Sequence, residues 1–228
     1  FVRRTDRDET NSNSSLLFPW FAQWFVEQFF KTGKSFEMDL KDKDAEAGRT
    51  WSGNAIDLSQ VYGHTEERTR VLRSPTKPGQ LRSQTINNGE FPVYWSSLTV
   101  AEQQACPMHF PSDIPLSDDV KGRFFVLGHP RQNLHPGLML FATLFLREHN
   151  RICGVLKRHY PSWDSDKLFS TSRRILNAIM LKITVESYIQ HINPQKTFEF
   201  WFNPSLVPLA EWDYKNRISF EFNLLYRW

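Results

Sequence analysis

One segment of this chain, residues 136–151, restricts the possible folds more than any other. It opens with Pro136-Gly137 and continues as an apolar run without a polar stripe as far as Leu146. A helix that is apolar on every side is surrounded by protein. Five polar residues, 147–151, follow without a glycine or proline. Charged groups that continue such a helix are costly unless each has a partner, so we predict a hydrogen-bonded network there.

The composition favours a packed helical protein and excludes some partners. The chain has 228 residues, which is enough for one large core, and it contains 19 Phe and 8 Trp. Such aromatic content suits a dense interior or the lining for a flat apolar ligand. The net charge of +3 is too small to indicate nucleic acid or a strongly anionic membrane surface. The longest nearly apolar stretch, 138–146, is far shorter than the roughly 20 residues of a membrane-spanning helix.

The cysteines and the first residue say little about the compartment. Cys106 and Cys153 allow at most one disulfide, and Cys153, in the middle of a predicted helix, is typical of a small buried hydrophobe. The chain begins with Phe1 rather than Met, and no signal peptide precedes it. We therefore interpret it as an internal piece of a longer protein, in which missing targeting signals carry no meaning.

The pattern along the chain predicts a connector over residues 1–15 and one mainly α domain, or the larger part of one, over residues 16–228. Helices are expected at 16–30, 65–72, 136–159, 164–192 and 213–228. Prolines and an Asn-Asn-Gly sequence between residues 74 and 95 indicate a small β-hairpin with a glycine-containing turn. The charged stretch 31–50 is expected to be an exposed loop, and residues 101–128 a loop with short helices.

Three polar positions have ordinary interpretations on pattern alone. Gln23 and Glu27 are four residues apart on one face of an aromatic helix, which describes a solvated stripe continued by Lys31. His135 stands just before a proline at a helix start, where it would be hydrogen-bonded to solvent. His149 lies inside the polar run, so we expect a buried histidine whose nitrogens have partners.

Three longer motifs carry a resemblance to one family. The sequence LFLREHNRIC, with the preceding PGLMLFAT, resembles the hallmark helix of the animal haem peroxidase and cyclooxygenase superfamily. The segments FAQWFVEQFFKT and NRISFEFNLLYRW are similar to two further motifs of its prostaglandin-endoperoxide synthase (cyclooxygenase) branch. This resemblance implies a mainly α, haem-peroxidase-like catalytic domain with a small β-hairpin. It also implies haem b as cofactor and a domain truncated before the proximal haem ligand.

The resemblance assigns roles around the haem, and one position departs from the family. Gln23 matches the family's catalytic distal glutamine. Glu27 stands where the family places its distal histidine, which moves a proton between the oxygens of a hydroperoxide. A carboxylate can do this only if its geometry and pKa are retuned. His135 takes an aliphatic position on the distal haem face and is a second candidate for this role; it and Thr32 are expected to contact the cofactor.

The resemblance also assigns a fatty-acid channel. Tyr226 matches the tyrosine that becomes a radical and removes a hydrogen atom from the fatty acid. Tyr188 matches the tyrosine that is hydrogen-bonded to it, on the helix that lines the channel. The residues expected to contact the substrate are Tyr188, Ile189, Ile192, Phe222, Leu225 and Trp228.

Metal ligands are not expected within the chain itself. No pair of His, Cys, Asp or Glu side chains has convincing metal-ligand spacing. The segment NAIDLSQVYG resembles the calcium-binding segment of mammalian peroxidases, but only Asp57 and Ser59 match its ligands. Because a hard cation needs more oxygen ligands, we interpret this segment as structural packing. The proximal haem histidine is expected just beyond Trp228.

The function that the resemblance implies is an oxidoreductase. It would be a haem-dependent dioxygenase and peroxidase that converts a polyunsaturated fatty acid and O2 into a prostaglandin-type endoperoxide through a tyrosyl radical, with a hydroperoxide as second substrate. The alternatives are a haem peroxidase without cyclooxygenase activity and a catalytically silent haem-binding homologue, which Glu27 suggests. By the same resemblance the full-length protein is a membrane-associated homodimer at the lumenal face of the endoplasmic reticulum.

Overall fold

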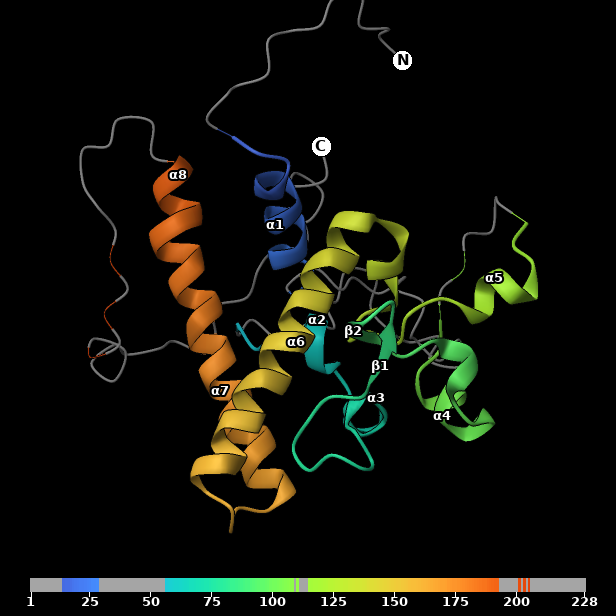
Figure 1. Ribbon diagram of the computed structural model, residues 1–228. Coiled ribbons are helices and arrows are strands. Elements are labelled where there is room, and N and C mark those ends of the chain that lie inside the picture. Colours follow the sequence, from blue (N-terminus) through green and yellow to red (C-terminus); the bar gives the residue numbers. More distant parts are fainter. Residues whose placement is uncertain are drawn as a thin grey trace, which may run out of the picture.

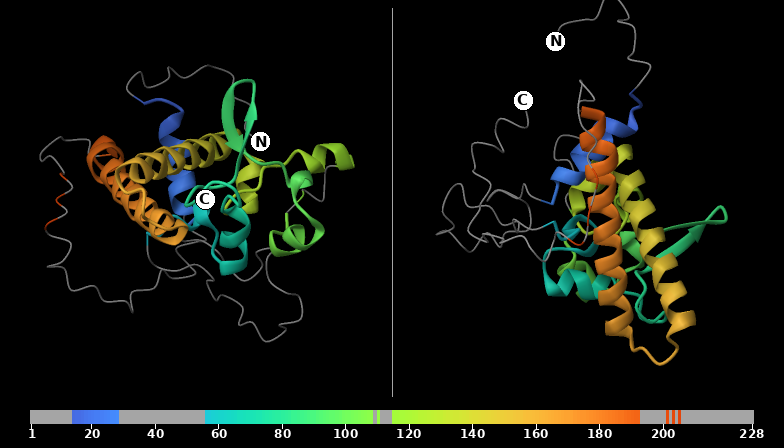
Figure 2. Two further views of the ribbon diagram at one scale, coloured as in Figure 1. Left: turned by 60° about the horizontal axis from the view of Figure 1, so that its bottom comes forward. Right: turned by 90° about the vertical axis from the view of Figure 1, so that its left-hand side faces the viewer.

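The structure, a computed structural model, describes residues 14–28, 56–108, 110, 115–192, 201, 203 and 205. It is mainly helical, as predicted (Figure 1). Two long helices, α6 (Pro136–His159) and α7 (Ser165–Ile183), run antiparallel and pack against each other. Helix α1 (Leu17–Val26) packs across the N-terminal half of α6, away from the loop that joins α6 to α7 (Figure 2).

Helix α6 has the predicted bounds. His135 is its N-cap residue, and Pro136 occupies the first helical position, where a missing N–H costs nothing. Its inner face is buried, but Leu140 and Leu144 are 37% and 44% exposed. The prediction that α6 is covered on every side is therefore wrong for this stripe, because the described elements pack against its other sides.

The polar half of α6 lies in the predicted hydrogen-bond network. Asn150 Oδ1 accepts from the backbone N–H of Leu81 at 2.7 Å. His149 is fully buried; its Nε2 donates to the carbonyl of Gly79 at 2.9 Å and its Nδ1 accepts from the Tyr62 hydroxyl at 2.8 Å. The prediction of a buried and fully partnered histidine is confirmed.

The predicted helix 164–192 is confirmed, with one irregularity. The side chain of Asp164 caps α7 by accepting from the N–H of Lys167. After α7 the helix widens into a π-helix over Thr184–Ile189 and closes as α8 (Gln190–Ile192). Since π-turns inside α-helices frequently mark functional sites, this segment singles out the end of the helix that carries Tyr188.

The remaining elements are short. They are α2 (Ser59–Tyr62), α3 (Glu66–Leu72), α4 (Val100–Ala105), α5 (Asp118–Gly122) and the 3-10 helices η1 (Trp95–Ser97) and η2 (Pro130–Leu134). The predicted hairpin is confirmed as β1 (Ser83–Ile86) antiparallel to β2 (Gly89–Pro92), but its turn does not contain the predicted glycine. Asn87 and Asn88, with φ of 48° and 64°, form its two-residue turn. Left-handed backbone at both turn residues matches the twist of a hairpin. Gly89 follows the turn and begins the second strand.

A glycine sets the distance between α1 and α6. A Cβ atom on Gly137 would lie 2.3 Å from ring atoms of Trp20, so a larger residue would push α1 away. Farther along α1, Trp24 is fully buried, and the centroid of its ring lies 4.4 Å from the ring centroid of Phe145 on α6. The position of α1, and of its polar side chains, therefore depends on this close contact.

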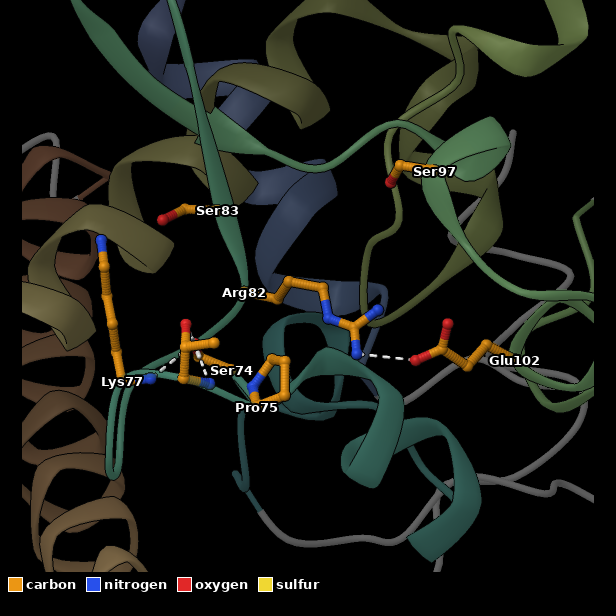
Figure 3. Close-up of a pocket in the computed structure, with 8 residues that line it drawn as sticks. Ser74, Pro75, Lys77, Arg82, Ser83, Ser97 and Glu102 are labelled. Atoms are coloured by element: carbon orange, nitrogen blue, oxygen red, sulfur yellow. Dashed lines mark hydrogen bonds and ion pairs between the residues drawn. The ribbon is translucent and has the colours of Figure 1, made fainter.

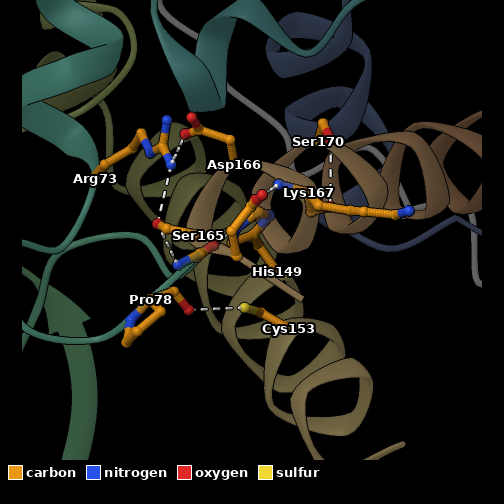
Figure 4. Close-up of polar contacts among 10 residues, drawn as sticks. Arg73, Pro78, His149, Cys153, Ser165, Asp166, Lys167 and Ser170 are labelled. Atoms are coloured by element: carbon orange, nitrogen blue, oxygen red, sulfur yellow. Dashed lines mark hydrogen bonds and ion pairs between the residues drawn. The ribbon is translucent and has the colours of Figure 1, made fainter. Parts of the chain in front are cut away.

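The far end of the α6–α7 pair is held by contacts with the chain after α3 (Figure 4). Arg73 pairs with Asp166 at 2.6 Å, and the backbone N–H of Gly79 donates to Ser165 Oγ at 3.0 Å. Cys153 is buried, its thiol donates to the carbonyl of Pro78, and burial raises its pKa. It is a free cysteine, and the expectation of a small buried hydrophobe is confirmed.

Several expectations fall outside the described residues: most of the connector 1–15, the loop 31–50 and the helix 213–228. Within the part of the chain that the structure describes, no helix is long and apolar enough to cross a membrane.

Candidate active site

The structure brings Gln23 and Glu27 together on one face of α1. The amide Nε2 of Gln23 donates to Glu27 Oε1 at 3.0 Å. Gln23 is exposed, whereas the side chain of Glu27 is only 12% exposed. A solvated stripe would leave both side chains in water. The carboxylate instead points into the protein, with its second oxygen towards another element.

That second oxygen faces a histidine that the sequence did not single out. His129 Nδ1 lies 3.8 Å from Glu27 Oε2, and the His129 side chain is 4% exposed. His129 is the N-cap residue of η2, where its Nδ1 accepts from the backbone N–H of Arg131 at 3.2 Å. It belongs to none of the three motifs that carry the family resemblance. Its position before Pro130 indicates a cap, but no local pattern connects it with Glu27.

His135 has a different environment. Its Nδ1 accepts from the backbone N–H of Gly137 at 3.1 Å, which caps α6, and its ring meets the edge of Trp20 with 5.6 Å between centroids. Trp20 lies on the same face of α1 as Gln23, so His135 borders the polar face. The side chain is exposed, and it shares no hydrogen bond with Glu27 in the described part of the chain.

On the other side of α1 lies an apolar pocket of about 320 Å³. Residues from α1, α6 and the helix end line it: Ser15, Leu17, Phe18, Phe21, Phe141, Ile183, Ser187, Tyr188 and His191. The Tyr188 ring stacks on Phe18 with centroids 5.0 Å apart, and burial raises its pKa, so the phenol keeps its proton. Ile189 and Ile192 do not line this pocket and are 37% and 51% exposed.

A polar hollow and the calcium-like segment lie elsewhere in the described part of the chain, and their side chains are held by hydrogen bonds. In the hollow, of about 380 Å³, Arg82 reaches Glu102 at 2.7 Å (Figure 3). That hydrogen bond, with a second from the backbone of Thr99, lowers the pKa of Glu102 to about 2. In the calcium-like segment Asp57 accepts from the N–H of Ser59 through its carboxylate and from an arginine through its carbonyl. The described residues contain no cluster of three or more His, Cys, Asp or Glu that could hold a metal.

Five of the residues singled out in the sequence lie outside the described residues. They are Thr32, Phe222, Leu225, Tyr226 and Trp228.

Comparison with known proteins decides the family. The Animal haem peroxidase family matches residues 28–222. The chain belongs to this family. Prostaglandin G/H synthase 2 of Equus caballus is 39% identical over 219 residues, and prostaglandin G/H synthase 1 of Mus musculus is 37% identical over 219 residues. Each alignment covers 94% of this chain and 32% of the relative, so the chain spans about a third of their length.

A solved structure is also similar. Peroxidase A from Dictyostelium discoideum aligns with a TM-score of 0.49 and 27% sequence identity, covering 59% of this chain and 24% of that chain. The family that the motifs indicated is thus confirmed by the family match and by the identity to the two synthases.

The donor set beside α1 fits one face of the haem that this family implies. An exposed amide, a mostly buried carboxylate and a buried imidazole follow one another from Gln23 through Glu27 to His129. These groups can accept and return a proton where a peroxide would bind, and the His135 and Trp20 rings border them. The residues therefore suit the peroxide side of a haem site.

Proposed function

We propose that this chain is part of a haem-dependent peroxidase and fatty-acid dioxygenase that forms a prostaglandin-type endoperoxide. One observation carries the proposal: α1 presents the pair Gln23 and Glu27 on one face and Phe18 and Phe21, in an apolar pocket, on another. A single helix thereby borders both a proton-exchanging site and a site for an apolar chain. Membership of the animal haem peroxidase family supports the first half, and the identity to prostaglandin G/H synthases supports the second.

On the peroxide side, haem b, when bound, supplies the electrons that break the O–O bond. Glu27 is the group proposed to carry the proton, and the Gln23 amide holds its Oε1 in place with a 3.0 Å hydrogen bond. Gln23, which is exposed, would meet the hydroperoxide first. His135 and Thr32 are proposed to contact the cofactor.

On the fatty-acid side, Tyr226 is proposed to lose an electron to peroxide-oxidised haem together with its phenolic proton. The resulting tyrosyl radical would then take a hydrogen atom from the polyunsaturated fatty acid, to whose carbon radical O2 adds. Tyr188 is proposed to hold Tyr226 by a hydrogen bond, which its protonated phenol allows. The substrate's apolar chain would lie along Tyr188, Ile189, Ile192, Phe222, Leu225 and Trp228.

Two other candidate functions keep a specific observation in their favour. A haem peroxidase without cyclooxygenase activity is favoured by the family match, which names peroxidases in general. A catalytically silent haem-binding homologue is favoured by the carboxylate at position 27, where the related synthases are expected to have histidine. The membrane-associated homodimer at the lumenal face of the endoplasmic reticulum rests on the resemblance to the synthases alone.

The test uses the full-length protein loaded with haem. Tyr226→Phe should abolish oxygen uptake with a polyunsaturated fatty acid and leave the reduction of an alkyl hydroperoxide largely intact. Unchanged oxygen uptake in the variant would remove Tyr226 from its role. Peroxide reduction without fatty-acid oxygenation in the wild type would favour the plain peroxidase, and absence of both activities the silent homologue.

A further inference from the structure

We propose that His129 and Glu27 act as one proton-transferring pair, in which His129 supplies the imidazole that position 27 lacks. This inference rests on the peroxidase half of the proposed function. Their side chains, 4% and 12% exposed, come from η2 and α1, and they meet with His129 Nδ1 at 3.8 Å from Glu27 Oε2. The family's distal group is thus replaced by two residues on different elements.

The three polar side chains form a path from the surface inwards. Gln23 is exposed, Glu27 is mostly buried and His129 is almost fully buried. Farther along η2, the fully buried Gln132 has no hydrogen-bond partner for either atom of its amide in the described part of the chain. Since buried amides are nearly always hydrogen-bonded, the interior beside His129 is suited to hold polar groups.

His129 has a partner in each of its protonation states. In the neutral ring Nδ1 accepts from the Arg131 backbone N–H at 3.2 Å, so the ring proton lies on Nε2. In the charged ring Nδ1 also carries a proton and can no longer accept. Glu27 Oε2 then becomes the natural acceptor, because a shift of about 1 Å brings 3.8 Å within hydrogen-bond range.

Two arginines accompany His129, one from a neighbouring element and one on η2. The guanidinium of Arg68, from α3, donates to the carbonyl of Leu127, two residues before His129. Arg131 follows two residues after it on η2. In general, a positive charge close to an imidazole favours its neutral form, and a carboxylate such as Glu27 favours its charged form. A buried imidazole under opposing charges of this kind can hold a proton briefly and release it.

The proposed step moves one proton. A hydroperoxide gives its O–H proton to the Glu27–His129 pair, and the pair returns it to the second peroxide oxygen, which leaves as the alcohol when the O–O bond breaks. The pair therefore ends in its starting charge state. The two electrons for the bond cleavage come from bound haem, so the two side chains need no redox change of their own.

The experiment compares variants of the full-length, haem-loaded protein by stopped-flow oxidation of the haem with an alkyl hydroperoxide. His129→Asn keeps an acceptor for the Arg131 N–H but removes the basic ring. It should slow the reaction about a hundredfold, as should Glu27→Gln, and the double variant should be no slower than the slower single one. His159→Gln, at the exposed end of α6, is the matched control and should leave the rate unchanged.

Two readouts separate this inference from a structural role and from failed folding. Binding of cyanide, which enters as HCN and must lose its proton, should slow at least about tenfold in both single variants. In the haem-free wild type, ¹⁵N spectra should show His129 protonated on Nε2 and shifted by Glu27→Gln. A wild-type rate in His129→Asn, or a proton on Nδ1 of the neutral ring, would overturn the pair. If the wild type itself does not react with peroxide, the proposed function fails instead.

Discussion

Two buried histidines, His149 and His129, lie in different regions of the molecule and have opposite kinds of environment. His149 is fixed on both sides, by the Tyr62 hydroxyl at 2.8 Å and the Gly79 carbonyl at 2.9 Å. Burial lowers its pKa to about 4, and the nearby positive charge of Arg73 acts in the same direction. His129 has instead a longer bond to a backbone N–H and a carboxylate at 3.8 Å.

The difference teaches which buried polar groups stabilise the fold and which suit chemistry. At His149 the position of every proton is determined by short bonds to neutral partners, and charging the ring would break one of them. At His129 the proton can be held by either of two groups of different charge. The first arrangement stabilises one structure, whereas the second allows two protonation states, which proton transfer requires.

The largest expected effect is the pH dependence of stability that His149 causes. Its folded pKa of about 4 lies below the ordinary value of 6.5, so between these values the unfolded chain binds a proton that the native ring does not. The ring therefore does not reduce the free energy of unfolding above pH 6.5. Below that value the free energy of unfolding falls as the pH approaches 4, by about 3 kcal/mol in all. Urea unfolding of the full-length protein across this range measures it.

The matched variants make this prediction specific. His149→Gln should flatten the pH dependence in that window, because the titrating ring is gone. His159→Gln, which removes an exposed histidine of the same helix, should leave it unchanged. An equally steep dependence in His149→Gln would assign the effect to other groups.

A second prediction concerns the packing of α1 against α6. The position of Glu27 depends on this packing, whereas the environment of His149 does not. Gly137→Ala places a methyl group 2.3 Å from Trp20, and such overpacking costs about 2 to 3 kcal/mol. The displacement should also slow haem oxidation by peroxide, because Gln23 and Glu27 lie on α1. Gly154→Ala is the control on the same helix: nothing lies within 4 Å of its added methyl, so it should be neutral or slightly stabilising.

A third prediction separates the two regions from the other side. Tyr62→Phe removes the hydroxyl that donates to His149 Nδ1 and leaves a buried acceptor unpaired, which costs about 1 to 2 kcal/mol. The rate of haem oxidation by peroxide should not change. Tyr160→Phe, at an exposed site, should alter neither quantity. A slower peroxide reaction in Tyr62→Phe would mean that the two regions are coupled.

Local signals explain which parts of the fold the sequence predicted. The bounds of α6, the start of the next helix at Asp164 and the existence of the hairpin follow from prolines, helix-start residues and turn residues, each of which acts within a few residues. The π-helix at Thr184–Ile189 has no such signal, and neither do the exposed Leu140 and Leu144. Burial of a helix face depends on which elements pack there, and a periodic pattern does not contain that information.

The candidate site also has one contact that local sequence signals predict and one that they do not. The approach of Gln23 to Glu27 follows from helical spacing, because residues four apart lie side by side. The approach of His129 to Glu27 joins distant parts of the chain through η2 and α1, and no spacing rule predicts it. The sequence accordingly indicates His135 as the second candidate for proton transfer and contains no pattern that points to His129.

The smallest expected effect distinguishes these two histidines. His135→Val removes the side chain that caps α6 at the N–H of Gly137, which should cost about 1 kcal/mol of stability. Its ring contacts Trp20 and shares no hydrogen bond with Glu27 in the described residues, so haem oxidation by peroxide should slow by less than about threefold. Glu27→Gln in the same assay should slow it about a hundredfold. The reverse order of the two rates would assign proton transfer to His135, and the buried pair would then be a structural contact like that of His149.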